Sequence, residues 1–344
     1  MFIRTLTSTL LASLSLFAQA GPAGPDEALL RTFLTRHRPV AAKFDFAAIG
    51  DQQYGPVGIA KWPALQSALN REAANLKFIV HTGDIKSGST LCDNAMFANR
   101  KESFEAFEIP FIITPGDNEW TDCHRENNGS YDSLERLAYL RTTFYPNNQS
   151  LGKRKITLTQ QSEDRRYSKY VENSMWSEGN VLFATLHVIG SNNNLGRNAA
   201  NDQEFRERTH ANFNWLKTVF SVARDNNFAG VVLTLQANPG FNGPRVRVSG
   251  LEEGFRDTFF VLEDEVINFN KPVLLIHGDS HEFHYDKPLL GARSGSYLDN
   301  FTRLEVPGSA DVHWIRVTVD PSRTALFSIE HADIPANFAR QTNP

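Results

Sequence analysis

The sequence predicts an α/β fold in which two packed mixed β-sheets are flanked by helices. Apolar, β-prone runs alternate with amphipathic stretches as far as residue 280, and short alternating runs alone follow. Four of the apolar runs also end in the same dipeptide, Gly-Asp, at Asp51, Asp84, Asp117 and Asp279. Residues 44–335 are predicted to form a single domain, because they contain no evident repeat, low-complexity tract or linker.

The elements are expected in a regular order, each placed by the spacing of its apolar residues. Strands are predicted at 44–51, 76–84, 109–114, 180–189, 230–235 and 271–276, and antiparallel strands at 301–306, 312–319 and 325–330. Helices are predicted at 62–75, with Pro63 in the first turn, and at 93–107, 131–144, 202–226 and 251–269. Residues 145–180 are polar and are expected to form an insertion.

The first 20 residues have the pattern of a signal peptide. Arg4 provides the positive charge, a short apolar core follows, and Ala18-Gln19-Ala20 is a small-x-small cleavage site. The apolar core is shorter than the roughly 20 residues that a membrane span needs, which disfavours an anchor. We therefore expect a secreted or periplasmic protein, with residues 21–43 as an N-terminal tail and no later membrane span.

The chain has two cysteines, Cys92 and Cys123, and each follows one of the Gly-Asp dipeptides. An oxidising compartment favours one disulfide between them, and two free thiols are the alternative.

Composition excludes some classes of function. Of the 344 residues, 41% are apolar and 22% charged, which is ordinary for a globular protein. The formal net charge of −4 does not favour polyanions, so no nucleic-acid-binding surface is predicted.

The four Gly-Asp dipeptides are the candidate functional residues, and each of them, with the polar residues that follow it, is called a corner here. Functional side chains of α/β proteins lie just beyond the carboxyl ends of strands, so these aspartates are expected to converge on one rim. A single aspartate after glycine is more often a turn residue or a helix cap. Four of them at strand ends predict a shared site, and clustered carboxylates require cations, so we predict a metal site.

The order of the corners resembles that of the calcineurin-like metallophosphoesterases, which include the purple acid phosphatases. The motifs of that family are Asp-x-His, Gly-Asp, Gly-Asn-His-Asp/Glu, a lone His, and Gly-His-x-His. This chain has Asp51-Gln52-Gln53, Gly83-Asp84, Gly116-Asp117-Asn118-Glu119, Gln236, and Gly278-Asp279-Ser280-His281 in the corresponding places. The resemblance extends from about residue 44 to residue 284, and several histidines of the family are replaced.

The resemblance implies two metal ions bound in an αββα sandwich. One ion would be held by Asp51, Gln53, Asp84 and His281, and the second by Asp84, Asp117, Gln236 and Asp279. Oxygen ligands in place of histidine nitrogens favour hard divalent ions such as Mn²⁺, Mg²⁺ or Fe²⁺.

The catalytic histidine of the family corresponds to Asn118, which donates a hydrogen bond but no proton at neutral pH. His124 in the adjacent loop, or water, is the expected proton source for a leaving group.

These features predict a secreted metal-dependent phosphohydrolase that cleaves phosphate mono- or diesters of small molecules at a dinuclear centre. The alternative is a degenerate relative that binds a metal or a phosphate ligand without turnover. A purely structural secreted domain would explain the fold but not the repeated corners.

Overall fold

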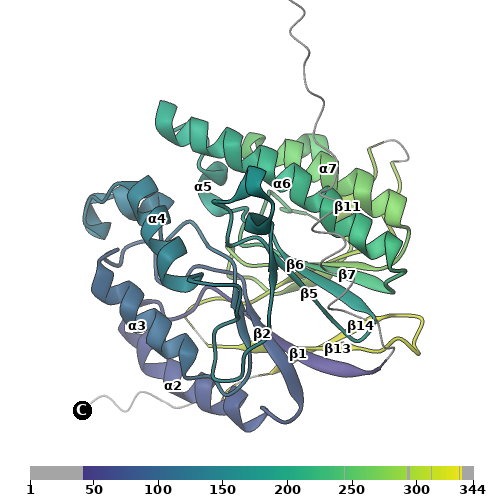
Figure 1. The fold of residues 1–344 in the computed structure, drawn as a ribbon, viewed down its shortest axis with the longest axis horizontal. Coiled ribbons are helices and arrows are strands. Elements are labelled where there is room, and N and C mark those ends of the chain that lie inside the picture. The colour runs from purple at the N-terminus through teal and green to yellow at the C-terminus, as the bar shows by residue number, and fades with distance from the viewer. Residues whose placement is uncertain (1–41, 244, 293–294, 311, 333, 335–344) are drawn as a thin grey trace, which may run out of the picture.

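The structure, a computed structural model, describes residues 42–243, 245–292, 295–310, 312–332 and 334. Two large β-sheets pack face to face, and helices cover both outer faces (Figure 1). The predicted fold class is confirmed. The predicted signal peptide, and residues 21–41 of the predicted tail, lie outside the described residues.

The first sheet has five strands in the order β14-β13-β1-β2-β3. Its parallel part is β1 (Phe44–Ile49), β2 (Leu76–His81) and β3 (Phe111–Ile113). β13 (Trp314–Val319) pairs antiparallel with β1, and β14 (Phe327–Ala332) antiparallel with β13. The strands that lead to Asp51, Asp84 and Asp117 are therefore parallel neighbours.

The second sheet has seven strands in the order β10-β12-β9-β7-β6-β5-β4. Its parallel part is β6 (Val181–Thr185), β7 (Gly230–Thr234), β9 (Val273–His277) and β12 (Phe301–Glu305). β4 (Thr159–Gln160), β5 (Ser174–Glu178) and β10 (His284–Asp286) add antiparallel edges, and β8 (Val246–Arg247) with β11 (Leu289–Leu290) forms a small separate sheet. The prediction of an antiparallel strand at 301–306 holds for one neighbour only, because β12 pairs antiparallel with β10 and parallel with β9.

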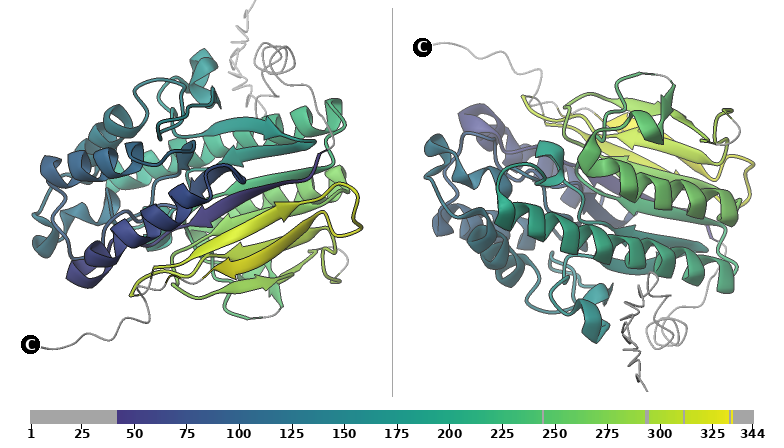
Figure 2. Two further views of the ribbon diagram at one scale, coloured as in Figure 1. Left: turned by 90° about the horizontal axis from the view of Figure 1, so that it is seen from below. Right: turned by 90° about the horizontal axis from the view of Figure 1, so that it is seen from above.

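Alternation along β1 shows how the layers form. Phe46 and Ala48 face the second sheet, in a core that also contains Phe183 and Ile276. Ala47 and Ile49 face outward, towards α2 (Gly55–Arg71), α3 (Asn94–Glu105) and α4 (Ser133–Phe144). On the other side of the molecule, α6 (Ala199–Asp225) and α7 (Glu253–Phe269) lie side by side over the second sheet (Figure 2).

Helix α2 begins seven residues earlier than predicted. Pro56, not Pro63, lies in its first turn, where its fixed φ and missing N–H are tolerated, and Pro63 lies within the helix. Tyr54 is the N-cap residue. The early start brings Tyr54 directly beside the corner of Asp51.

Residues 145–180 contain β4, two short 3-10 helices, Gln161–Glu163 and Arg165–Tyr167, and β5. A buried ion pair ties this segment to α4: Arg141 contacts Glu172 at 2.5 Å and 3.0 Å. The ring of His187 lies 2.7 Å from the same carboxylate. Burial raises the pKa of Glu172 and its two partners lower it by more, so that the pKa lies well below the usual range.

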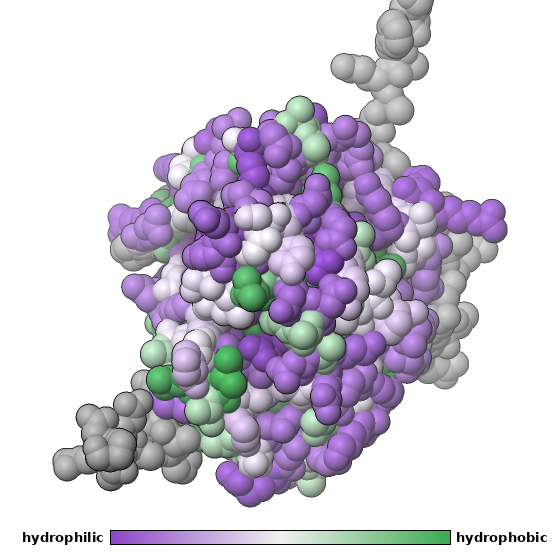
Figure 3. All heavy atoms as spheres, turned by 90° about the vertical axis from the view of Figure 1, so that its left-hand side faces the viewer, coloured by the Kyte–Doolittle hydropathy of each residue, from purple (hydrophilic) through white to green (hydrophobic). Residues whose placement is uncertain are grey.

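The face shown in Figure 3 is mainly hydrophilic, with small scattered apolar patches. Within the described ranges, no helix combines the length and the apolar character that crossing a bilayer would require.

Candidate metal centre

The Gly-Asp corners of both sheets meet at one place. Carboxylate oxygens of Asp84, Asp117 and Asp279 all lie within 4.8 Å of one another. Asp84 and Asp117 follow strands of the first sheet, whereas Asp279 follows β9 of the second. In the part of the chain that the structure describes, no other set of three or more His, Cys, Asp or Glu side chains meets this distance.

The glycines of these corners have a steric reason. A Cβ on Gly278 would lie 1.9 Å from Oδ2 of Asp51, and one on Gly116 would lie 2.1 Å from Oδ1 of Asp84. Each glycine therefore leaves space for a carboxylate from another corner. The glycines of the other two corners are required by different contacts: a Cβ on Gly50 would lie 1.8 Å from Oγ1 of Thr82, and one on Gly83 would lie 2.5 Å from the backbone N of Gly116.

The backbone turns three of the aspartates into the left-handed region. Asp51, Asp84 and Asp279 have φ of 53°, 57° and 81°. Aspartate and asparagine tolerate this region better than most residues. A corner that requires such a turn therefore favours the same residue type as the metal chemistry does.

Backbone N–H groups hold the carboxylates in place. The N–H of Asp279 donates to Oδ1 of Asp51 at 3.0 Å, and the N–H of Asn118 donates to Oδ1 of Asp84 at 3.1 Å. The N–H of Asn238 donates to Oδ2 of Asp279 at 3.0 Å. The corners thus form a chain of mutual hydrogen bonds.

Glu119 braces two of the corners. Its Oε1 accepts hydrogen bonds from the N–H groups of Gly116 at 2.6 Å and Asp84 at 3.2 Å. Its Oε2 is buried and has no hydrogen-bond partner among the described residues. Burial, together with the charge of Asp117, raises the pKa of Glu119 to about 7.

The carboxylates are too close to be ionised together without a cation. Burial raises the pKa of Asp51 and of Asp84 well above the usual range, and the neighbouring carboxylates raise both further. The same two causes raise the pKa of Asp279 to about 7. The amine of Lys86 is buried near the carboxylates, and burial lowers its pKa to about 8. Such a site favours a divalent ion, which would compensate the buried negative charge.

Gln236 does not present its oxygen to this cluster. Its Oε1 accepts the N–H of Gly190 at 2.6 Å, and its Nε2 donates to Oδ1 of Asp117 at 3.2 Å. A backbone N–H can only donate, so it determines which end of the amide faces it. Ser191 donates to the other oxygen of Asp117 at 2.7 Å. In this arrangement the amide nitrogen of Gln236, and not its oxygen, faces the carboxylate of Asp117.

Gln53 and His281 lie on the other side of Asp51. The Nε2 of Gln53 donates to Oγ of Ser103 on α3 at 3.3 Å, and its buried Oε1 has no partner among the described residues. The Nδ1 of His281 lies 3.1 Å from the carbonyl oxygen of Ser309, so Nδ1 carries the proton. Its Nε2 lies 3.8 Å from Oδ1 of Asp51.

Asn118, predicted at the catalytic position, lies within the centre. Its Nδ2 donates to Oδ2 of Asp84 at 2.7 Å and to the hydroxyl of Tyr54 at 3.0 Å. His124, the predicted proton source, is exposed, and its Nδ1 lies 2.9 Å from the carbonyl oxygen of Thr121. No described contact joins His124 to the carboxylates.

Two arginines lie beside the centre around Asp122. Arg125 contacts Oδ2 of Asp122 at 2.7 Å, and Arg197 lies 3.8 Å from its Oδ1. Ser191 bridges Asp122 and Asp117, with distances of 3.0 Å and 2.7 Å. Burial and the charge of Asp117 raise the pKa of Asp122 to about 6.

The sequence analysis missed Tyr54, Asp122 and Ser191. Tyr54 and Asp122 had an available signal, since each lies within five residues of a corner aspartate. Ser191 had none, because it reaches Asp117 only through the packing of the two sheets.

The predicted disulfide is confirmed. Cys92 and Cys123 are bonded, with their Cα atoms 5.7 Å apart, and they join the loops that follow β2 and β3. Both sulfurs lie 3.7 Å from the carbonyl oxygen of Asn118. The bridge therefore supports the backbone directly beneath the centre.

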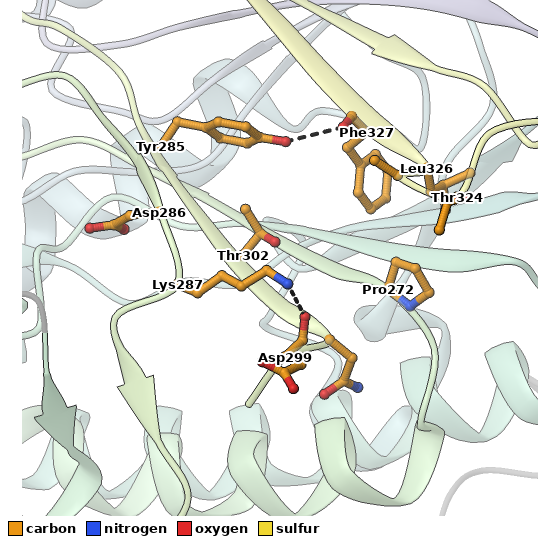
Figure 4. A pocket seen from close by; sticks show the side chains of 11 residues that line it. Pro272, Tyr285, Asp286, Lys287, Asp299, Thr302, Thr324, Leu326 and Phe327 are labelled. Carbon is orange, nitrogen blue, oxygen red and sulfur yellow. Dashed lines mark hydrogen bonds between the residues drawn. The ribbon is translucent and has the colours of Figure 1, made fainter. Parts of the chain in front are cut away.

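Two cavities outside the centre differ in their relation to it. One of about 480 Å³ adjoins the corner of Asp279 and is lined by polar side chains, among them Asn238, Ser280, His284 and Arg303. Another, of about 280 Å³, lies between β10, β12 and β14 and is lined by Tyr285, Lys287 and nine further residues (Figure 4). None of the corner aspartates lines the second cavity.

Comparison with known proteins finds a similarity among solved structures and none among family models or curated sequences. No family model matches the sequence, and no curated protein matches it. Among solved structures, the chain is similar to a purple acid phosphatase from seeds of yellow lupin (Lupinus luteus), with 12% sequence identity and a TM-score of 0.45. The alignment covers 88% of this chain and 56% of the lupin chain, so the chain spans about half the length of that protein.

Proposed function

We propose that this protein is a metal-dependent phosphohydrolase that cleaves phosphate mono- or diesters of small molecules. The observation that carries the proposal is the convergence of Asp84, Asp117 and Asp279 within 4.8 Å. Residues 44–335 would form its one catalytic domain.

The donor set fits a hard divalent cation. The three carboxylates supply oxygen atoms only, which suits Mn²⁺, Mg²⁺ or Fe²⁺ better than Zn²⁺. The raised pKa values of Asp84 and Asp279 and the unpartnered Oε2 of Glu119 indicate negative charge that the protein leaves uncompensated. When bound, a divalent ion would polarise a phosphoryl oxygen and acidify a water molecule.

The side chains around the cluster suit a phosphate ester. The amide of Asn118 faces the cluster, and a phosphoryl oxygen would replace Asp84 or Tyr54 as the acceptor of one of its two hydrogen bonds. Arg125 and Arg197 supply positive charge beside the acidic residues, and guanidinium groups bind phosphate oxygens in pairs. The polar cavity next to Asp279 offers space for a leaving group.

Proton supply limits the choice of leaving group. Asn118 gives no proton, and His124 is bonded to the backbone of its own loop. We propose that water protonates the leaving group, so aryl esters should react faster than alkyl esters. General acid assistance is worth roughly 10²–10⁴-fold, which is the disadvantage expected for an alkoxide.

We also propose that the protein is secreted or periplasmic, through removal of residues 1–20. The disulfide supports an oxidising compartment. Amino-terminal sequencing of the protein exported by its host would test this, and a chain that retains Arg4 would contradict it.

Binding without turnover is the second candidate. The orientation of Gln236 favours it, since its amide oxygen accepts the N–H of Gly190 and its nitrogen faces Asp117. Hydrolysis of p-nitrophenyl phosphate and bis-p-nitrophenyl phosphate with added Mn²⁺ distinguishes the two. Turnover that Asp84→Ala abolishes, and that Asp264→Asn on the exposed side of α7 leaves unchanged, supports the enzyme. Bound metal without turnover of either ester supports the binder.

A further inference from the structure

Tyr54 places a hydroxyl group inside the centre. Its hydroxyl lies 3.0 Å from Oδ2 of Asp84 and 3.0 Å from Nδ2 of Asn118. Its ring lies against the ring of His281, with the centroids 5.2 Å apart and the planes at 62°. The Tyr54 side chain therefore lies between Asp84 and His281, two residues that the resemblance assigns to the same metal ion.

The other two residues that the resemblance assigns to that ion, Gln53 and Asp51, form hydrogen bonds with protein groups. The Nε2 of Gln53 donates to Oγ of Ser103. Oδ1 of Asp51 accepts the N–H of Asp279, and its Oδ2 lies 3.5 Å from Oγ1 of Thr82. The carboxylate of Asp51 thus stabilises the backbone of the corner of Asp279.

The other position has no such obstruction. Asp84, Asp117 and Asp279 come from three corners and two sheets. The hydrogen bonds given above number three on the carboxylate of Asp84, two on that of Asp117 and one on that of Asp279, so each keeps at least one acceptor site. A carboxylate has about four acceptor sites, so bonds from backbone N–H groups and from Gln236 are compatible with a cation on the same oxygens.

We infer that the centre binds one divalent cation, on Asp84, Asp117 and Asp279, and that the Tyr54 hydroxyl occupies the space of the second ion. This inference rests on the proposed function, which it refines. Tyr54 and Asn118 then both donate to Oδ2 of Asp84, on the side of the cation where a dinuclear enzyme has its other metal. Tyr54 is a positioning residue for Asp84 and Asn118.

The experiment counts the ions. Metal-free protein is dialysed against Mn²⁺, the bound manganese is measured by elemental analysis, and the Mn²⁺ signal is recorded by electron paramagnetic resonance. We expect one ion per chain and the six-line spectrum of isolated Mn²⁺. Two ions per chain with a spin-coupled spectrum would overturn the inference and leave the proposed hydrolase intact.

Three variants assign the position. Asp279→Asn should weaken Mn²⁺ binding at least about 100-fold, since the loss of an outer-shell partner alone costs roughly 10–100-fold and here a ligand is lost. His281→Ala should keep one ion per chain with an affinity within about threefold of the parent protein, as should the surface control Asp264→Asn. A tenfold loss of affinity in His281→Ala would refute the inference, because it would make His281 a ligand.

No manganese on the parent protein would defeat both the inference and the metal-dependent function. Hydrolysis of p-nitrophenyl phosphate is measured separately on the same samples. One bound ion without turnover would support the inference and contradict the hydrolase, so the two failures are distinguishable.

Discussion

Replacement of Asp279 by asparagine should stabilise the metal-free protein and abolish its stabilisation by metal. Asparagine has nearly the same shape as aspartate and tolerates the φ of 81° at this position. Its Oδ1 can still accept the N–H of Asn238. The substitution therefore removes a charge and changes little else.

The magnitude follows from the pKa of Asp279, which is about 7 in the folded protein against the ordinary 3.8. One pKa unit corresponds to about 1.4 kcal/mol, so ionising this group in the folded protein costs about 4 kcal/mol at most. Solvent on its partly exposed side reduces this, and we expect about 2–3 kcal/mol.

The dependence on pH has a definite sign. A folded-state pKa above the unfolded one stabilises the fold at low pH, and this contribution is lost as the pH rises towards 7. Metal-free parent protein should therefore lose stability between pH 4 and pH 8 relative to Asp279→Asn. The two proteins should differ by less than about 1 kcal/mol at pH 4.

Urea unfolding in EDTA at pH 4, 6 and 8 measures this difference, with Asp264→Asn as the control for a surface charge. Excess Mn²⁺ at about 100 times its dissociation constant should add about 2.7 kcal/mol to the parent protein and nothing comparable to the variant. An Asp279→Asn protein that is less stable than the parent in EDTA at pH 8 would refute the reasoning, since the carboxylate would then stabilise the fold by itself.

Three further predictions concern the support of the centre. Replacing Cys92 and Cys123 together by serine should lower the free energy of unfolding by about 3.7 kcal/mol, because the bridge closes a loop with a sequence separation of 31, and urea unfolding measures it. Gly278→Ala should abolish Mn²⁺ binding and lower the free energy of unfolding by about 1–3 kcal/mol, because its Cβ would lie 1.9 Å from a carboxylate oxygen. Gly250→Ala is the control and should have little effect, because a Cβ there meets no atom within 4 Å. Glu172→Gln should cost about 3–5 kcal/mol above pH 4.5, because it leaves a buried arginine without its counter-charge, and the loss should diminish as the pH falls through the depressed pKa.

Each of these has an outcome that contradicts it. Unchanged thermal and urea stability after reduction would show that the bridge does not constrain the unfolded chain. Mn²⁺ binding by Gly278→Ala would show that the corner relaxes without cost to the site. Glu178→Gln is the control for Glu172→Gln, because the Glu178 carboxylate is paired with Lys77 at the surface. An equal loss of stability in the two variants would show that burial of the Glu172 ion pair does not determine its contribution.

The sequence allowed the layers and the convergence of the corners to be predicted because both follow from local rules. Alternation along β1 and helical spacing on α6 are properties of short segments. The Gly-Asp dipeptides carry a steric signal as well as a chemical one, since Gly116 and Gly278 each leave space for the carboxylate of a different corner.

The details of the centre were not predictable in this way. The orientation of the Gln236 amide depends on the N–H of Gly190, 46 positions away in the chain. The position of Tyr54 depends on where α2 begins, and the prediction placed Pro63 in its first turn, which Pro56 occupies. The correspondence with the family motifs therefore predicts where Gln53 and Gln236 lie in the chain, whereas their hydrogen-bond partners determine how the side-chain amides are oriented.

The same carboxylates that would bind a cation oppose folding without one. Burial and mutual repulsion raise the pKa values of Asp51, Asp84 and Asp279, so the folded protein accepts protons more readily than the unfolded chain does. A cation that binds only the folded protein replaces those protons and stabilises the fold by mass action. Metal affinity and metal-dependent stability should therefore both increase between pH 5 and pH 8. If Mn²⁺ did not change the free energy of unfolding anywhere in this range, the carboxylates would not form a metal site.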